Sequence, residues 1–350
     1  MANIEIAGVC NLKCSYCFAE DHMQAARTSP ASAFISLELF EKRLDFLDRS
    51  GIDQARLIGG EPTLHPNFPE LIHRARQRGK QIVAFSHGLM PERALACLAA
   101  LPPDECTVLI NMNAMKTADG PSQKEETRRC ATIKRLGPRA LLGFNIYQTN
   151  FQLDFLLPII LDAGCRQAIR LGLAHPTPSG QNEYLHPKEY PAVGQKIVQF
   201  ARAAAERGVR LEFDCGFVRC MFSDEDIETL RWARADFGWR CSPILDVDIS
   251  GGQAIHCFPL AGKIQAPVTG TVDASALRNE LSAQTSPYRI AGIYRECSTC
   301  LFKQRGECPG GCLGHTMRRF RQTPFRLTVP AARPEGQALP VIIVQPGVSD

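Results

Sequence analysis

Apolar and polar positions follow two alternating patterns over the first 215 residues, and these patterns predict strands and helices in turn. Short apolar runs predict strands at residues 4–8, 55–58, 81–86, 106–111, 141–147 and 168–173. Apolar residues at helical spacing predict helices at residues 37–50, 92–100, 123–136, 152–163 and 188–207. Ser36 can cap the first of these helices, and Gly51 follows its end. Six predicted strands that alternate with helices favour an α/β fold with a parallel sheet and outer helices.

The pattern changes after about residue 215. Helical spacing fades, apart from residues 224–235, and cysteines, glycines and turns take over. We therefore expect an α/β domain over 1–215 and a small domain over 216–325 that is organised by metal rather than by a large core. Residues 326–350 are rich in proline and are expected to form a mobile tail, in which residues 341–344 can add an edge strand.

Composition excludes several classes of protein. The 350 residues are 45% hydrophobic, enough for a sizeable core, and their net charge of +4 gives no case for nucleic-acid binding. Residues 1–9 lack the basic start of a signal peptide, and no apolar run reaches membrane-spanning length. We therefore expect a cytoplasmic protein without a membrane or nucleic-acid partner. In such a chain, 15 cysteines indicate metal sites rather than disulfides.

Three cysteines follow the first predicted strand at the spacing Cys-x3-Cys-x2-Cys, namely Cys10, Cys14 and Cys17. Three thiolates on one tight loop can bind three irons of a [4Fe–4S] cluster and leave the fourth iron open to a small molecule. A zinc knuckle and a disulfide are the alternatives. Zinc sites usually pair two Cys-x2-Cys units or add histidines, so this spacing fits zinc poorly.

A second motif, Leu-Ile-Gly-Gly-Glu-Pro-Thr-Leu-His-Pro at residues 57–66, follows the second predicted strand. Gly59 and Gly60 let backbone oxygens approach a ligand closely, and the Glu61 carboxylate can accept from an ammonium group. Alone, Gly-Gly-Glu-Pro is usually a turn. It lies about forty residues after a cysteine loop that contains Asn-Leu-Lys and has Tyr16 before its last cysteine. Together the two motifs resemble the radical S-adenosylmethionine (SAM) superfamily.

The resemblance implies a partial (β/α)6 barrel whose open side admits substrate, with a catalytic [4Fe–4S] cluster on the cysteine loop. It also implies that Gly59, Gly60 and Glu61 receive the amino group of SAM. Polar residues in or after the later strands need partners, which the ribose and carboxylate of SAM would supply. These candidates, with the aromatic residue of the cysteine loop, are Tyr16, Ser86 (in Ser86-His87-Gly88), Asn111 or Asn113, Asn145 and Arg170.

Six further cysteines lie towards the end of the chain, in the order Cys241-x15-Cys257, Cys297-x2-Cys300 and Cys308-x3-Cys312. This order resembles the SPASM extension of radical SAM proteins, which binds auxiliary [4Fe–4S] clusters, or its shorter twitch variant with a single cluster. A zinc ribbon on the last four cysteines is the alternative. One departure from the family pattern is that no cysteine follows Cys312.

The resemblance assigns to a first auxiliary cluster Cys241, Cys257 and Cys312. The upstream ligand of this cluster is then Cys220 or Cys215. The resemblance assigns Cys297, Cys300 and Cys308 to a second cluster. The second cluster lacks a fourth ligand unless Cys215, His315 or another side chain supplies it, so we expect one or two auxiliary clusters.

The activity implied by the resemblance is reductive cleavage of SAM, after which the 5′-deoxyadenosyl radical abstracts hydrogen from a substrate. SPASM relatives include peptide maturases, which favours an oxidoreductase that oxidises or crosslinks a peptide. The alternative is radical dehydrogenation or rearrangement of a small-molecule biosynthetic intermediate. Auxiliary clusters either accept the electron left on the substrate or ligate the substrate. The expected partners are an electron donor of flavodoxin or ferredoxin type and, for a peptide substrate, a separate leader-binding protein, because the first strand starts by residue 4.

Overall fold

The computed structural model describes residues 1–27, 33–114, 116–117, 120–121 and 123–321. These residues form a ten-stranded sheet in the order β12-β11-β10-β1-β2-β3-β4-β7-β8-β9. They also form a small hairpin of β5 (Lys116–Thr117) and β6 (Gly120–Pro121). The edge strand predicted at 341–344 and the tail predicted at 326–350 lie outside the described residues.

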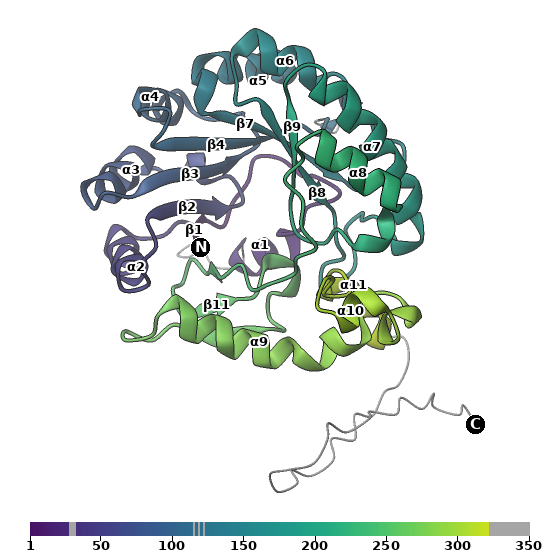
Figure 1. Ribbon diagram of the computed structural model, residues 1–350. Helices are drawn as coiled ribbons and strands as arrows, with labels where there is room; N and C mark the ends of the chain where they lie inside the picture. Colours follow the sequence, from purple (N-terminus) through teal and green to yellow (C-terminus); the bar gives the residue numbers. More distant parts are fainter. Residues whose placement is uncertain (28–32, 115, 118–119, 122, 322–350) are drawn as a thin grey trace, which may run out of the picture.

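The central six strands of this sheet are the ones predicted from the sequence: β1 (Asn3–Ala7), β2 (Gln54–Gly59), β3 (Gln81–Ser86), β4 (Cys106–Asn111), β7 (Ala140–Ile146) and β8 (Ala168–Leu173). Each pairs in parallel with the next. Figure 1 shows them as an arc with helices along its outer side. These helices are α2 (Leu37–Arg49), α3 (Phe68–Gln77), α4 (Glu92–Ala100), α5 (Gln123–Leu136), α6 (Leu156–Ala163) and α7 (Tyr190–Ala205). The predicted partial barrel is confirmed, with α3 as an additional helix.

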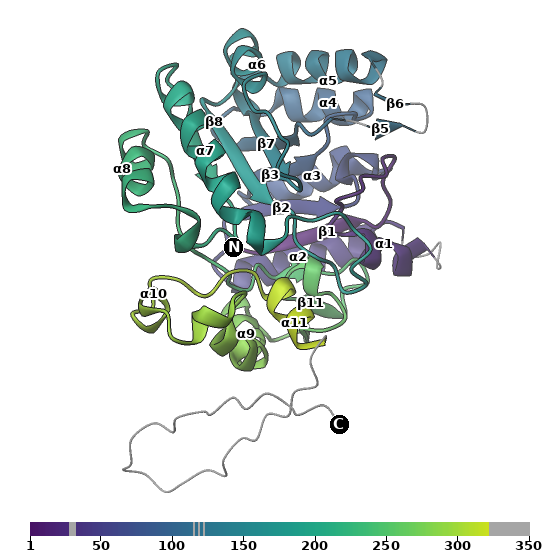
Figure 2. The same cartoon turned by 90° about the vertical axis from the view of Figure 1, so that its right-hand side faces the viewer.

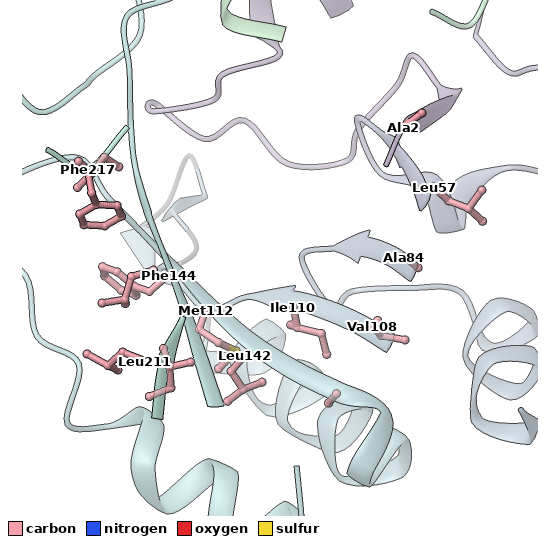
Figure 3. Close-up of a cluster of buried hydrophobic side chains, with 14 of the residues drawn as sticks. Ala2, Leu57, Ala84, Val108, Ile110, Met112, Leu142, Phe144, Leu211 and Phe217 are labelled. Carbon is pink, nitrogen blue, oxygen red and sulfur yellow. The ribbon is translucent and has the colours of Figure 1, made fainter. Parts of the chain in front are cut away.

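Side chains alternate between the two faces of the arc, and this alternation brings polar groups to its inner side. In β4, Val108 and Ile110 are fully buried in the core, whereas Asn111 lies on the opposite face and is less buried. Figure 3 shows Val108, Ile110 and other apolar side chains of this core. The same alternation gives intermediate burial to Arg56 in β2 and to Arg170 in β8.

The sheet is wider than the sequence predicts. β9 (Arg210–Phe213) adds a parallel strand beside β8, and β10 (Asp246–Val247) pairs in parallel with β1. β11 (Gln253–Ile255) and β12 (Gln265–Pro267) continue from β10 in antiparallel fashion. Residues after 215 therefore extend the barrel sheet. The four added strands are two to four residues long, too short for an alternating pattern to stand out.

The helices outside the barrel units are α1 (Glu20–Arg27), α8 (Asp224–Trp232), α9 (Ala274–Ala291), α10 (Leu301–Gln304) and α11 (Leu313–Arg321). Single turns of 3-10 helix are η2 (Pro62–Leu64), η3 (Gly137–Arg139), η4 (Pro187–Glu189), η5 (Arg219–Met221), η6 (Phe258–Leu260) and η7 (Arg295–Ser298). Helix α9 corrects the expectation that helical spacing ends with α8. The Asp273 side chain caps α9, and Leu277 and Leu281 are buried, but Pro287 and many polar residues obscure its pattern. In Figure 2 the segments from α9 to α11 lie together on one side of the barrel.

No helix within the described part of the chain is long and apolar enough to cross a membrane.

Candidate active site

The cysteine loop, residues 10–17, begins just after β1. The Cys17 N–H donates to Cys14 O at 3.1 Å, and the Leu12 N–H donates to Cys10 Sγ at 3.4 Å, so the loop turns tightly around its thiols. Burial raises the pKa of the Cys17 thiol to about 12, and the nearby Cys14 and Cys10 thiols add to the rise. Thiolates this close together repel one another unless positive charge lies between them. Bound iron would provide that charge, and coordination to a metal deprotonates a thiol. The donor set therefore fits an iron–sulfur cluster.

A single metal ion fits this loop less well. Among the described residues, no three Cys, His, Asp or Glu side chains converge as a single-ion site requires. Zinc binds sulfur at about 2.3 Å, so its ligand atoms lie nearly in contact with one another. A [4Fe–4S] cluster is bound at separate iron corners, so its ligands stay further apart.

Gly59 and Gly60 pack directly against the segment that leads into the cysteine loop. The Gly60 N–H donates to Ala7 O and the Glu61 N–H donates to Val9 O, both at 2.8 Å. A Cβ atom on Gly59 would lie 2.1 Å from Ala7 O, and the Gly59 φ of +145° is one that L side chains rarely adopt. A Cβ atom on Gly60 would lie 2.2 Å from Val9 O. The two glycines therefore let the end of β2 pack directly against the segment that enters the cysteine loop. The close approach that the sequence predicts for a ligand is made here by the backbone of the chain itself.

The Glu61 side chain is fully buried, and internal donors occupy both of its oxygens. Oε1 accepts from the N–H (3.2 Å) and the hydroxyl (2.6 Å) of Thr63. Oε2 accepts from the Ser86 hydroxyl (3.1 Å) and the His87 N–H (3.0 Å). The contact of Glu61 and Ser86 with SAM stays a prediction. The bonds themselves tie the end of β2 to the end of β3.

His87 links this carboxylate to the cysteine loop. Its Nδ1 accepts from the Leu89 N–H at 3.1 Å, so in the neutral ring the proton is on Nε2. Nε2 lies 2.8 Å from Asn11 Oδ1 and 3.1 Å from Glu61 Oε2, and it donates towards both. His87 is not among the site residues predicted from the sequence, although its place directly after Ser86, at the end of a barrel strand, is a signal for such a role.

Tyr16 bridges the cysteine loop to β4. Asn111 Nδ2 donates to the Tyr16 hydroxyl at 2.8 Å, and that hydroxyl bonds in turn to the Cys14 thiol. The Tyr16 ring stacks on Tyr147, with ring centres 4.7 Å apart. Two predicted residues, Tyr16 and Asn111, therefore meet at a sulfur of the loop. Asn113, the alternative to Asn111, instead bonds the backbone of β7.

Arg170 and Asn145 lie on neighbouring strands, β8 and β7. Arg170 forms an ion pair with Asp214 at 2.6 Å, and its guanidinium lies 5.5 Å from the centre of the Phe85 ring of β3. Arg56 lies 5.1 Å from the same ring, and burial lowers its pKa to about 10, with Arg170 adding to the shift. Asn145 packs over the glycine of β8. The inner face of the barrel therefore carries several charges, and Arg170 already has a partner within the protein.

The cysteines predicted as auxiliary ligands all lie after β9, and they are Cys220, Cys241, Cys257, Cys297, Cys300, Cys308 and Cys312. Cys215, an alternative ligand, comes just after the same strand. His315, the other alternative, packs against the rings of His175, Tyr184 and Tyr190. Ring contacts therefore account for the position of His315.

Comparison with known protein families matches residues 4–117 to the Radical SAM superfamily. Among curated proteins, the antilisterial bacteriocin subtilosin biosynthesis protein AlbA of Bacillus subtilis (strain 168) is 24% identical over 156 residues, which are 43% of this chain and 34% of AlbA. GTP 3′,8-cyclase of Chlorobaculum tepidum is 35% identical over 99 residues, which are 27% of this chain and 28% of the cyclase. The match thus spans about a third or less of the length of either relative.

Solved structures match over most of the chain. The complex of anSMEcpe with AdoMet and the Kp18Cys peptide is 17% identical with a TM-score of 0.60, covering 89% of this chain and 88% of that one. SuiB of Streptococcus suis bound to the precursor peptide SuiA is 11% identical with a TM-score of 0.63, covering 91% and 72%. At these identities the matches show a shared fold, which includes the C-terminal region.

Proposed function

Residues 4–117 form a radical SAM domain, and from this premise we propose that the protein removes hydrogen from a peptide substrate by radical chemistry. The observation that carries the proposal is the junction of the two motifs, where the Gly-Gly-Glu end of β2 is hydrogen-bonded to the segment that enters the three-thiol loop. The cofactors of the superfamily are a [4Fe–4S] cluster and SAM. Bound there, they would supply the radical chemistry that removes a hydrogen atom from an unactivated C–H bond.

The residues of the chain hold and orient these groups. The ligands of the cluster would be Cys10, Cys14 and Cys17. The bond from the Tyr16 hydroxyl to the Cys14 sulfur, supported by Asn111, would tune the reduction potential of the cluster. The ion pair of Arg170 and Asp214 gives the barrel fixed charges that can position a polar group of the substrate.

A groove close to the cysteine loop supports a peptide as the substrate. Its volume is about 240 Å³, and its lining includes Pro176, Thr177, Ser179, Pro259, Lys263 and Arg318. The loop after β8, which forms one wall, is fastened to the cysteine loop, because the Ser15 hydroxyl donates to Glu183 and the Glu183 N–H donates to Ser15 O, both at 2.7 Å. Hydroxyl and cationic groups along a groove can bond the carbonyls of an extended chain. The bacteriocin role in the name of AlbA and the peptides bound to anSMEcpe and SuiB support the same substrate class.

The radical SAM activity is tested by product analysis. Anaerobically reconstituted protein, with a flavodoxin- or ferredoxin-type donor, should convert SAM into 5′-deoxyadenosine and methionine. Replacing Cys10, Cys14 and Cys17 together by alanine should abolish this reaction and leave the C-terminal iron in place. Cys97→Ala, in the outer helix α4, is the matched control and should keep the activity. A triple variant that still makes 5′-deoxyadenosine would show that the cysteine loop is not the cluster site.

The substrate class is tested with short peptides encoded beside the gene, supplied together with any leader-binding protein encoded there. We expect such a peptide to accelerate 5′-deoxyadenosine formation and to lose hydrogen or gain an internal crosslink, as read by tandem mass spectrometry. Deuterium placed at the modified carbon should appear in 5′-deoxyadenosine. If SAM cleavage responds to a small biosynthetic intermediate and every peptide stays unchanged, the peptide proposal is wrong.

A further inference from the structure

Two cysteines only five positions apart, Cys215 and Cys220, belong to different groups of thiols. The Cys215 thiol lies close to the thiols of Cys241 and Cys312. The Cys220 thiol lies instead close to the thiols of Cys308, Cys297 and Cys300. One short segment therefore supplies a thiol to each of two groups.

Backbone bonds hold together the first group, which consists of Cys215, Cys241, Cys257 and Cys312. The Gly216 N–H donates to Arg240 O at 3.1 Å, which sets Cys215 beside Cys241. The Ile244 N–H donates to His256 O at 2.8 Å, which brings the segment after Cys241 to Cys257. Helix α11 packs against η6, and Cys312 and Cys257 directly precede these two helices, so the packing brings Cys312 to Cys257.

The second group consists of Cys220, Cys297, Cys300 and Cys308. Cys297 lies in η7, and Cys300 directly precedes α10. The Cys308 N–H donates to Phe302 O at 3.2 Å, which folds the segment back towards Cys300. The Arg219 guanidinium lies 4.9 Å from the centre of the Phe302 ring, and this contact packs η5, with Cys220, onto the same segment.

We propose that each group binds one auxiliary [4Fe–4S] cluster through four thiolates, with Cys220 as the fourth ligand of the second cluster. The family pattern places the last ligand of that cluster after Cys312, and residues 313–350 contain no cysteine. Cys220, which precedes the first auxiliary motif, fills the position of the fourth ligand. This assignment replaces the expectation that Cys220 and Cys215 are alternatives for the first cluster and that Cys215, His315 or another side chain completes the second. It rests on the proposed function for the nature of the cofactor.

Two complete sets of thiolates limit what the auxiliary clusters do. A cluster with three protein ligands leaves one iron open to a substrate atom, whereas a cluster with four thiolates does not. Both auxiliary clusters are therefore suited to electron transfer rather than to binding the substrate. The segment from Cys215 to Cys220 spans at most about 18 Å, so the two clusters are neighbours. Asp214 connects the first of them to the ion pair with Arg170 in the barrel.

The test uses the full chain with Cys10, Cys14 and Cys17 replaced by alanine, so that only the auxiliary iron remains. After anaerobic reconstitution we expect about eight irons per chain, as two [4Fe–4S] clusters require. Removing two ligands of one group should eliminate one cluster and leave about four irons with the EPR signal of the other cluster. The two such variants are Cys241→Ala with Cys257→Ala and Cys297→Ala with Cys300→Ala. The first variant leaves only the signal of the second cluster, and the second variant leaves only the signal of the first cluster.

The single variant Cys220→Ala then decides the assignment. We expect it to alter or remove the signal of the second cluster and to leave the signal of the first unchanged. The proposal is overturned if both signals persist, if only the first signal changes, or if the second group binds zinc. Cys97→Ala is the matched control and should retain both signals, and far-UV circular dichroism checks that each variant is folded. Since Cys10, Cys14 and Cys17 are replaced in this background, the outcome does not depend on SAM cleavage. A failure of this assignment can therefore be distinguished from a failure of the proposed function.

Discussion

Replacing Glu61 by glutamine tests what this buried carboxylate does. Each of its oxygens accepts from a backbone N–H, that of Thr63 on Oε1 and that of His87 on Oε2. Glutamine has one oxygen and one NH₂ group, so in either orientation its NH₂ group faces a backbone N–H. Turning the hydroxyl of Thr63 or Ser86 cannot relieve this conflict, because the backbone donors are fixed.

The cost of Glu61→Gln follows from the bonds that it changes. One charge-assisted bond is lost and a buried donor is left without an acceptor, which costs about 1–3 kcal/mol. The remaining bonds change from a charged to a neutral acceptor, which adds about 1 kcal/mol. The free energy of unfolding should therefore fall by about 2–4 kcal/mol. With an unfolding entropy of about 2.1 cal/mol/K per residue over 350 residues, Tm should fall by about 3–5 °C.

Thermal unfolding of cluster-free protein without SAM, followed by circular dichroism, is the assay for Glu61→Gln. Glu38→Gln is the matched control, because Glu38 is 80% exposed and pairs with Lys42 on the surface of α2, and it should leave Tm unchanged. Suppose instead that Glu61→Gln melts with the wild type and only weakens the binding of SAM. That outcome would contradict a structural role for Glu61 and assign its carboxylate to the ammonium group of SAM.

Three further substitutions test other parts of the site. Gly59→Ala should lower Tm more than Gly79→Ala. Both glycines have a positive φ, but a Cβ atom would meet a β1 carbonyl at Gly59 and nothing within 4 Å at Gly79. Equal Tm values for the two variants would contradict this packing. Tyr16→Phe removes a hydroxyl bonded to a loop sulfur, so the cluster potential should fall by on the order of tens of millivolts in an EPR-monitored titration, and an unchanged potential would dismiss that bond. Burial opposes the charge on His22, but the Glu5 carboxylate at 2.8 Å outweighs it and raises the His22 pKa above 6.5. The stability that a raised pKa contributes is complete below the pKa of the unfolded state and is lost as pH rises through the pKa of the folded state. Between about pH 6 and 9, the Tm of the wild type should therefore fall more than the Tm of His22→Asn. Parallel curves of Tm against pH would argue against an ion pair between His22 and Glu5.

The barrel strands could be predicted from the sequence because each is a run of five or more residues whose apolar members face a common core. β9 and β10 could not, because their identity as strands depends on pairing with β8 and β1 rather than on their own short sequences. Helix α9 carries a readable signal in Asp273, Leu277 and Leu281, but Pro287 within it argues against a helix on local grounds. Tertiary packing overrides that local preference.

The site shows the same division between local and long-range information. The cysteine loop and the Gly-Gly-Glu segment could be found because each is a contiguous motif. The partners of Glu61 could not, because Ser86 and His87 come from the next strand and reach the carboxylate only after the sheet has formed. Likewise, the spacing of Cys215 and Cys220 cannot say which thiol joins which group, since this depends on the contacts of Gly216 and Arg219 with segments further along the chain.

The boundary predicted at residue 215 marks a change in composition, and the contacts across it show why the two regions act as one unit. Asn3 and Glu5 of β1 are buried, and their side chains are bonded to the C-terminal region: Asn3 Nδ2 donates to Asp246 Oδ1 at 2.6 Å, and Glu5 Oε2 accepts from the Ile249 N–H at 3.0 Å. A chain ending at residue 215 would leave these polar groups without those partners and β1 with an unpaired edge, both of which are costly. β1 leads directly into the cysteine loop. The region after residue 215 therefore supports the strand that positions the cysteine loop.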